Sequence, residues 1–373
     1  FFTGLCSASI SANATPSAWA LEQIIHPFQS VRTSGMGGVQ LTTGFYEQNL
    51  LGGNPARHSS NKIWKFYLLD ASVETNTNMI RLAQSLKGGL SGGESALIGK
   101  IAKTAGQNNH GRAQFNTFHV YLPNVGGGKM SYALGLVSAS AQADASLRRN
   151  FQIDPTVIVD AGPSIGVSRK FLADESLLIG ANIYGRYRLS MASGISLTNI
   201  IQGASLNPLK NGGEGGQVDF DLGETYRLPW SWKSWQLMTG ASLNNVMGGD
   251  FPMATKPMKL ANSAMPQKRR FGFGVSAQRD SLWKFDKTML AIEAYDIGNN
   301  SYGSTFRLIH MGGEIAYGVL RLRGGLNQGY WAEGLGLDLK ALLLDFATYG
   351  EEMSYNIGTY EDRRYALRLS IQI

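Results

Sequence analysis

The chain has 373 residues, of which 46 are glycine, 10% are aromatic and only 16% are charged. Glycine at nearly twice its usual share, together with many Tyr, Phe and Trp, is typical of numerous short strands joined by turns and argues against a helical or α/β enzyme. A single cysteine excludes a disulfide framework and a thiolate metal cluster, and the net charge of +7 lacks the interleaved aromatics of a nucleic-acid surface.

No stretch of the sequence reaches the roughly 18 consecutive apolar residues of a membrane-spanning helix. A β-barrel crosses a bilayer without such a run, because only alternate residues face lipid and every backbone group is paired between strands. The mean hydropathy of −0.13 suits a barrel but also a soluble protein. The strand pattern therefore has to decide between them.

Residues 1–20 have the character of a processing segment. They are rich in small and apolar residues and contain Ala12-Asn13-Ala14 and Ala18-Trp19-Ala20, which match the A-x-A sequence near a signal-peptide cleavage site. We expect residues 1–20 to be a signal-peptide remnant or, alternatively, a flexible N-terminal tail. Residues 21–373 are then expected to form one barrel domain.

A helical insertion is expected at about residues 76–106, after strand-like windows at 34–45 and 62–73. Apolar residues here recur at helical spacing, and Ser91-Gly92-Gly93-Glu94 fits a capping box. We predict two short amphipathic helices. They either plug or gate an opening of the lumen, or simply pack on the barrel end.

The clearest strand patterns lie in the second half of the chain, where apolar residues alternate with polar ones and charges keep to one face. These windows are 217–228, 319–326, 332–340 and 341–349. Weaker windows are 114–122, 129–140, 157–168, 176–189, 235–246, 270–279, 287–297 and 306–317.

The C-terminal window, Arg363 to Ile373, alternates in the same way and carries Tyr365 near its start. It resembles the terminal strand that barrel-assembly machinery reads, although such strands mostly end in Phe. The prediction is an all-β fold: a transmembrane antiparallel outer-membrane β-barrel of about 14 strands, with two short helices in the N-terminal third. A soluble sandwich or propeller would not explain the paired charges on the polar faces, and no 40–50-residue period occurs.

Three local patterns combine glycines with alternating residues. They are Ser34–Val39 with Gly53–Ala56, Val218–Tyr226 with Gly240–Val246, and Leu322–Asn327 with Gly334–Asp338 and Asp362-Arg363-Arg364. Together they resemble the FadL-like superfamily of outer-membrane barrels, including its TraF-like and PorV-like branches. The resemblance is spread over about residues 30–373.

The resemblance implies a monomer-closed barrel of about 14 strands with an N-terminal segment that enters or plugs the lumen. In fatty-acid transporters of the superfamily, hydrophobic substrates bind inside and leave sideways into the membrane, whereas PorV-like members serve secretion. Only some 10–30 residues precede the first strand expected here, which is shorter than the N-terminal hatch of those transporters. This length argues against fatty-acid uptake specifically.

Charged residues on the polar faces of the expected strands are the candidates for lining the lumen. They are Arg186, Arg188, Asp219, Asp221, Arg227, Glu293, Arg321, Arg323, Asp338, Lys340, Asp345 and Arg368. Opposite charges should pair across strands, which favours a narrow or filled lumen. Aromatic residues beside expected turns are the candidates for membrane-interface anchors. They are Trp230, Trp232, Trp235, Tyr330 and Trp331.

No catalytic motif is present: the sequence has neither G-x-S-x-G nor H-E-x-x-H, and no two of its five histidines lie within four residues of each other. We expect no enzymatic activity, no metal and no cofactor. The leading hypothesis is transport of hydrophobic molecules or lipid. The alternatives are a structural or secretion-docking barrel, oligomeric and lipid-enclosing in one version, and a general solute porin.

The expected partners follow from this interpretation. They are membrane lipid, barrel-assembly machinery and a hydrophobic small molecule, with no nucleic acid, and a homo-oligomer is left open. A basic loop that includes Lys256, Lys259 and Lys268 would contact lipopolysaccharide phosphates if it is extracellular, and is otherwise a solvated loop. The expected location is the bacterial outer membrane.

Overall fold

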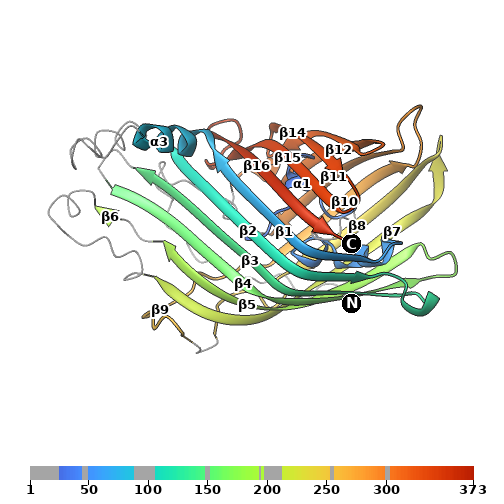
Figure 1. The fold of residues 1–373 in the computed structure, drawn as a ribbon, viewed down its shortest axis with the longest axis horizontal. Coiled ribbons are helices and arrows are strands. Elements are labelled where there is room, and N and C mark those ends of the chain that lie inside the picture. Colours follow the sequence, from blue (N-terminus) through green and yellow to red (C-terminus); the bar gives the residue numbers. More distant parts are fainter. Residues whose placement is uncertain are drawn as a thin grey trace.

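A computed structural model describes residues 25–43, 49–87, 106–147, 152–192, 195–196, 212–252, 256–298 and 303–373. Its 14 long strands are antiparallel and form a closed barrel, as the sequence predicts (Figure 1). Strand β1 (Lys65–Asn76) closes the barrel by pairing with β16 (Glu361–Gln372). Two-residue strands β6 (Ile195–Ser196) and β9 (Asn262–Ser263) are attached to β4 and β7.

The remaining long strands follow one another around the wall in chain order. They are β2 (Asn108–Leu122), β3 (Met130–Leu147), β4 (Gln152–Phe171), β5 (Leu177–Ala192), β7 (Gly213–Trp232), β8 (Trp235–Asn244), β10 (Arg270–Arg279), β11 (Lys287–Ile297), β12 (Ile309–Tyr317), β13 (Leu320–Asn327), β14 (Tyr330–Asp338) and β15 (Leu342–Glu352).

Alternation along each strand separates an apolar outer face from a polar inner face. On β16, Leu367 and Leu369 point outward and are exposed, whereas Arg368 and Ser370 between them point inward and are buried. A soluble protein buries its apolar side chains, but this wall buries polar and charged ones. The largest fully buried side chains include Arg188 and Arg364. This is the pattern of a membrane-spanning barrel with a polar interior.

The two ends of the barrel differ in their connections. At one end, the turn end, segments such as 233–234 and 318–319 join neighbouring strands, and β1 starts and β16 ends here. The other end, the loop end, carries longer segments such as 245–269. The wall is also uneven: β4 and β7 have 20 residues each, whereas β13 has 8 (Figure 1). The wall therefore extends least far along the barrel axis around β13.

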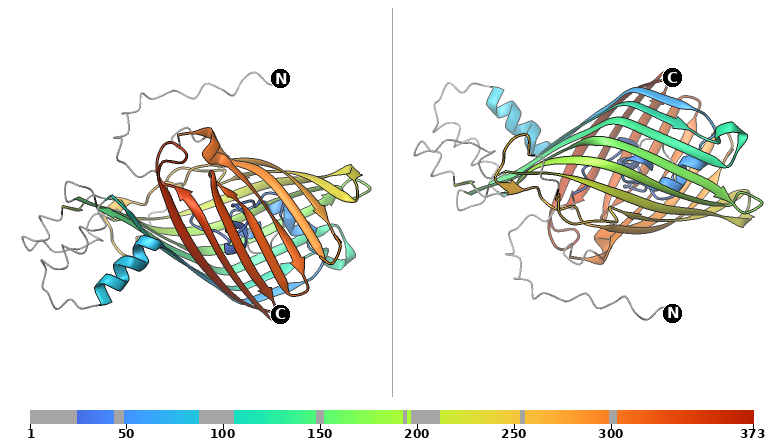
Figure 2. Two further views of the ribbon diagram at one scale, coloured as in Figure 1. Left: turned by 90° about the horizontal axis from the view of Figure 1, so that it is seen from above. Right: turned by 90° about the horizontal axis from the view of Figure 1, so that it is seen from below.

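Helix α3 (Thr77–Lys87) confirms the first of the two helices expected in the insertion at about 76–106, and it stands at the loop end (Figure 2). The second helix, with its capping box, lies outside the described residues, as does the segment 1–20. No helix in the described part of the chain is long and apolar enough to span a membrane.

The strand expected at 34–45 is wrong. Residues 25–43 and 49–61, here called the plug, lie inside the barrel and are drawn in blue in Figure 2. The plug contains helix α1 (Val31–Ser34) and the 3₁₀ helix η1 (Pro55–Ser60). The first strand begins only at Lys65, so the argument from a short segment before the first strand no longer holds.

Candidate functional site

The glycine-rich turn of the plug packs directly on glycines of the wall. A Cβ atom built on Gly312 of β12 would lie 2.2 Å from the Met36 carbonyl oxygen, and one on Gly325 of β13 would lie 2.7 Å from the Gly37 nitrogen. Gly37 itself has φ +70°, a conformation that favours glycine. Gly37, Gly312 and Gly325 have no Cβ atom to hold the two backbones apart, so the glycines of the wall and of the plug turn create the docking place of the plug.

Glu293 of β11 binds the next part of the plug. Its carboxylate accepts hydrogen bonds from the backbone N–H groups of Gln40 (2.6 Å), Leu41 (2.8 Å) and Thr42 (3.0 Å), and from the Thr42 hydroxyl (2.9 Å). Hydrogen bonds to an ionised acceptor are about twice as strong as neutral ones. Glu293 therefore acts as a latch between wall and plug.

Asn54 and η1 fix the second half of the plug. The Asn54 side chain accepts from the Ala56 N–H (3.1 Å), while its amide donates to the Leu41 and Glu224 carbonyl oxygens (2.9 and 2.8 Å). Pro55 occupies the first turn of η1, where a missing N–H costs nothing. One residue thus joins the two halves of the plug to each other and to β7.

The end of η1 contacts β4 and β5. His58 hydrogen-bonds Asn182 at 3.0 Å, and the Ser59 and Ser168 hydroxyl oxygens lie 2.6 Å apart. Burial lowers the pKa of His58 to about 4 and that of Arg57 to about 10, with Asn182 and Glu293 respectively opposing the shift. His58 is therefore neutral at physiological pH, and it docks as an uncharged group.

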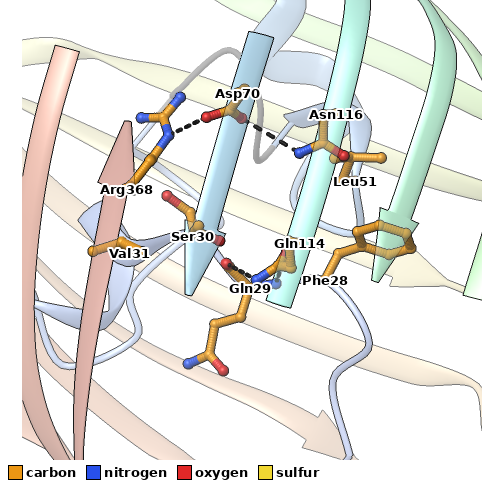
Figure 3. Close-up of a pocket in the computed structure, with 10 residues that line it drawn as sticks. Phe28, Gln29, Ser30, Val31, Leu51, Asp70, Gln114, Asn116 and Arg368 are labelled. Atoms are coloured by element: carbon orange, nitrogen blue, oxygen red, sulfur yellow. Dashed lines mark hydrogen bonds and ion pairs between the residues drawn. The ribbon is translucent and has the colours of Figure 1, made fainter. Parts of the chain in front are cut away.

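Three apolar clusters lie among the polar side chains of the lumen, and the largest of them is formed around Phe28. Phe28, Leu50 and Leu51 of the plug pack together with Tyr67 of β1, and Tyr121 and Ala133 complete the cluster. Two small cavities flank it and share Phe28 and Leu51. The first, of about 20 Å³, is drawn in Figure 3, and the second measures about 10 Å³. Each has room for about one water molecule, so the cluster is closely packed in this state.

The wall beside this cluster is irregular. The pairing of β3 with β4 shifts between Gly135 and Ser138, and the pairing of β4 with β5 skips Gly162 and Pro163. Proline has no N–H to give to a neighbouring strand. On β2, Phe118 has φ +56°. The hydrogen-bond ladder is thus interrupted on adjoining strands, on the side of the barrel where Gly162 and Pro163 line the smaller cavity.

A chain of ion pairs follows the lumen wall across five strands. Arg323 pairs with Glu314 and Asp345, both at 2.7 Å, and Arg368 pairs with Asp345 (3.1 Å) and Asp70 (2.6 Å). Arg32 of the plug extends the chain, with Nε 2.8 Å from Glu314. Buried charges are tolerated only when paired in this way. The plug is therefore part of the charge balance of the lumen.

Gly336 allows this chain to pass over β14. A Cβ on Gly336 would lie 2.6 Å from both Arg323 Nη2 and Asp345 Oδ1. Any side chain at this position would separate the two charges, which come from β13 and β15 on either side of it.

A second charged cluster lies toward the loop end. His110 stands between Asp144 (2.6 Å) and Glu74 (2.8 Å), and the Tyr349 hydroxyl also donates to Glu74 (2.7 Å). Arg112 of the same cluster donates to the Gln29 side chain of the plug at 2.6 Å. The cluster therefore also contacts the plug.

No protein-family model and no curated protein matches the sequence. Among solved structures, the toluene transporter TbuX of Ralstonia pickettii matches with a TM-score of 0.51 and 10% identity, covering 93% of this chain and 98% of that one. A deltaS2 mutant of the monoaromatic hydrocarbon channel TodX has a TM-score of 0.48 and 12% identity over 93% and 97% of the two chains. For the Pseudomonas putida toluene transporter TodX, the values are 0.39 and 8% over 95% and 98%.

The protein shares the closed-barrel fold of TbuX. At these identities the likeness to TbuX concerns the fold alone.

Most of the residues expected in the lumen of this barrel face its interior. Arg188 forms a two-pronged ion pair with Asp160, both contacts at 2.7 Å, and Arg186 lies over the rings of Phe28 and Tyr184. Other buried members of the expected set are Asp219, Asp221, Glu293, Arg323, Asp345 and Arg368.

Four of the expected lumen residues lie at the turn end instead. Arg227 is exposed and donates to the Asp174 carbonyl oxygen, and Lys340 is exposed in a hairpin turn with φ +65°. Arg321 and Asp338 face each other at 3.5 Å and are half-buried. Alternation predicts the face on which a residue lies but not its position along the barrel axis. Arg321, Asp338 and Lys340 lie at or just beyond the ends of their strands, and Arg227 lies on β7 just past its last pair with β5.

The aromatic residues proposed as anchors are distributed over both ends of the barrel. Trp230 and Trp232 are exposed beside the turn at 233–234, and Trp235 follows it half-buried. Trp331 is exposed at the loop end, where Tyr330 is half-buried and donates to Glu352 at 2.8 Å.

The sequence did not reveal several of the residues that line the lumen. Asp70 and Glu74 alternate with Ala71 and Val73 on β1, and Glu314 lies inward on β12. The two-residue period was present in these strands, but their windows are less regular. Arg32 gave no signal, because plug residues follow no strand period.

Proposed function

We propose that the protein is a channel of the bacterial outer membrane for hydrophobic molecules, in which the plug closes the route. The observation that carries the proposal is the apolar cluster of Phe28, Leu50 and Leu51, the largest of three between plug and wall. A hydrophobic molecule in this lumen would find its most extensive apolar contacts there. TbuX is described as a toluene transporter, which makes monoaromatic hydrocarbons the first compounds to test.

The irregular wall next to this cluster suggests the exit. Missing ladder hydrogen bonds at Gly162 and Pro163 weaken the joint between β4 and β5. Outside the same region of β3, Leu136 and Val137 are exposed toward the membrane. We infer that a hydrophobic molecule leaves sideways here, once the plug has moved away from the wall.

A general solute porin is less compatible with the geometry, because the plug and the paired charges fill the described lumen. A docking barrel without transport would have no need of an apolar cluster enclosed behind the wall. Low ion conductance combined with uptake of an apolar compound would separate the proposed channel from both.

The test locks the plug to the wall with a disulfide. Ser59 and Ser168 already touch through their hydroxyls at 2.6 Å, so Ser59→Cys with Ser168→Cys brings two thiols within bonding reach. The variant also carries Cys6→Ser, which removes the native thiol. We expect oxidation to lower uptake of radiolabelled toluene by cells to a tenth or less, and dithiothreitol to restore it.

The two single-cysteine variants in the same background are the controls, and oxidation should leave their uptake unchanged. If the oxidised double variant transports as fast as the reduced one, plug movement is not required and the proposal fails.

A further inference from the structure

The outer wall carries an apolar groove near the loop end, apart from the lumen. Its cavity measures about 660 Å³ and is lined mostly by apolar side chains. Ile292, Met311 and Leu326 form its floor on β11, β12 and β13, where Ile292 pairs with Met311 and Met311 with Leu326. All three are exposed on the membrane-facing side.

Two loops cover this floor from the loop end. They are the β11–β12 and β15–β16 loops, which meet through the hydrogen bond from the Ser304 N–H to the Tyr355 carbonyl oxygen (3.1 Å). The β13–β14 hairpin between them is short. Phe306 and Ile357 of these loops line the groove. A Cβ on Gly329 of the hairpin would lie 2.8 Å from Ile357. The groove is thus a formed pocket and not only a flat patch of the wall.

The inner face of the wall behind the groove shows from which direction a ligand can enter. Directly behind the floor, Gly312 and Gly325 contact Met36 and Gly37 of the plug. The lumen is filled at this point by the plug backbone, whereas the outer side of the groove opens among side chains that face the bilayer. An occupant therefore enters from the membrane.

The depth of the groove matches the border between headgroups and acyl chains. Trp331 pairs with Leu326 on the neighbouring strand, and the Arg363 guanidinium lies 3.7 Å from the Trp331 ring centre. Trp and Arg side chains prefer this border, where one end is apolar and the other is hydrated. Arg363 is held in this place by its ion pair with Glu361 and by the hydrogen bond that it donates to the Trp331 carbonyl oxygen (2.7 Å). Ser304 and Asn356 add polar groups to the lining.

We propose that this groove binds one acyl chain of a membrane lipid, held separately from any molecule that passes through the lumen. The chain lies on Ile292, Met311 and Leu326, under Phe306 and Ile357. A cavity of this volume is in the range of specific ligand sites, and its opening toward the bilayer selects the lipid.

The experiment uses the full chain in nanodiscs of phospholipid that contains a small fraction of a phospholipid with a photoactivatable diazirine on its acyl chain. After irradiation, mass spectrometry of peptides locates the label. We expect labelling concentrated on the segments that contain Met311, Leu326 and Phe306. Leu326→Trp, which fills the groove, should lower this labelling at least fivefold.

Leu322→Trp is the matched control, because Leu322 lies outward on the same strand, four residues away, and is also exposed. It should keep full labelling. Ile357→Asp, a loop substitution outside the wall, should also lower labelling and covers the case in which Leu326→Trp does not fold. Folding is checked by heat-modifiable migration in gels.

Three results would overturn the proposal: labelling spread evenly over the outer wall, loss of labelling on adding excess toluene, or photo-crosslinks that join two copies of the chain. The second would assign the groove to a small hydrophobic solute, and the third to contact between barrels.

Discussion

Glu293 shows how a single buried carboxylate can hold a mobile segment. A carboxylate inside a protein is costly unless its oxygens accept hydrogen bonds, and here all four contacts described come from residues 40–42 of the plug. Wall and plug therefore satisfy each other: when the plug leaves, the carboxylate and three backbone N–H groups all lose their partners.

Glu293→Gln tests this latch. The amide keeps one acceptor oxygen but loses the charge, so we expect docking of the segment to weaken by about 1–3 kcal/mol. Hydrogen exchange at the Gln40, Leu41 and Thr42 amides should accelerate by roughly 5- to 150-fold. Glu333→Gln, at an exposed outward position of β14, is the control. Unchanged hydrogen exchange in Glu293→Gln would show that Glu293 does not hold the plug in place.

The sequence predicts that Glu293 lies on the polar face of a strand, but it does not predict which residues donate hydrogen bonds to Glu293. Alternation along one strand reports which side a residue faces. What Glu293 binds depends on a turn more than 250 residues earlier in the chain. The same applies to Asn54. The sequence Gly53-Asn54-Pro55 marks this residue as part of a motif, but the motif does not predict its hydrogen bonds.

At the scale of elements, the sequence predicts the strands of the wall but not the plug. Windows such as 287–297 coincide with the observed strands because lipid outside and charges inside impose a two-residue period. Residues 34–45 imitate this period with Val39 and Leu41, yet Gly37 and Gly38 have φ of +70° and +89°, outside the β region. A plug segment has no strand beside it, so its apolar residues follow the shape of the lumen.

The glycine contact between plug and wall gives a paired prediction. A Cβ on Gly325 would lie 2.6 Å from the Met36 carbonyl carbon of the plug and 2.5 Å from the Met311 carbonyl oxygen of β12, whereas one on the neighbouring Gly324 would have no atom nearer than 4.0 Å. We expect Gly325→Ala to displace the plug turn, at about 1–3 kcal/mol, and Gly324→Ala to leave it in place.

Limited proteolysis of the native protein reports this displacement. Cleavage within residues 25–43 should become faster in Gly325→Ala and remain at the wild-type rate in Gly324→Ala. Equal rates in both variants would mean that the close glycine contact does not position the plug.

At the scale of the whole molecule, wall and plug are separable parts. The backbone hydrogen bonds of the wall run from strand to strand and close at the β1–β16 pair, so the barrel needs no backbone partner from the plug. The composition and alternation of the chain are sufficient to predict the wall as a closed barrel. The filling of its lumen depends on close contacts between distant residues, which no local pattern encodes.

Deleting residues 25–61 tests this separation. We expect the variant to fold as a barrel and to conduct ions in a planar bilayer roughly tenfold or more above the intact protein, because the strands alone would enclose a polar passage. A variant that folds but stays closed would show that the loops at the loop end block the lumen without the plug.

The ion-pair chain along the wall has a consequence for what an opened passage would admit. With Arg32 in place, the chain contains three guanidinium groups and three carboxylates, from Glu314, Asp345 and Asp70. When the plug withdraws, Arg32 leaves with it, and the Glu293 carboxylate loses its donors at the same time. The vacated passage becomes electronegative, so it repels anionic solutes and favours cations, while uncharged apolar molecules experience no such barrier.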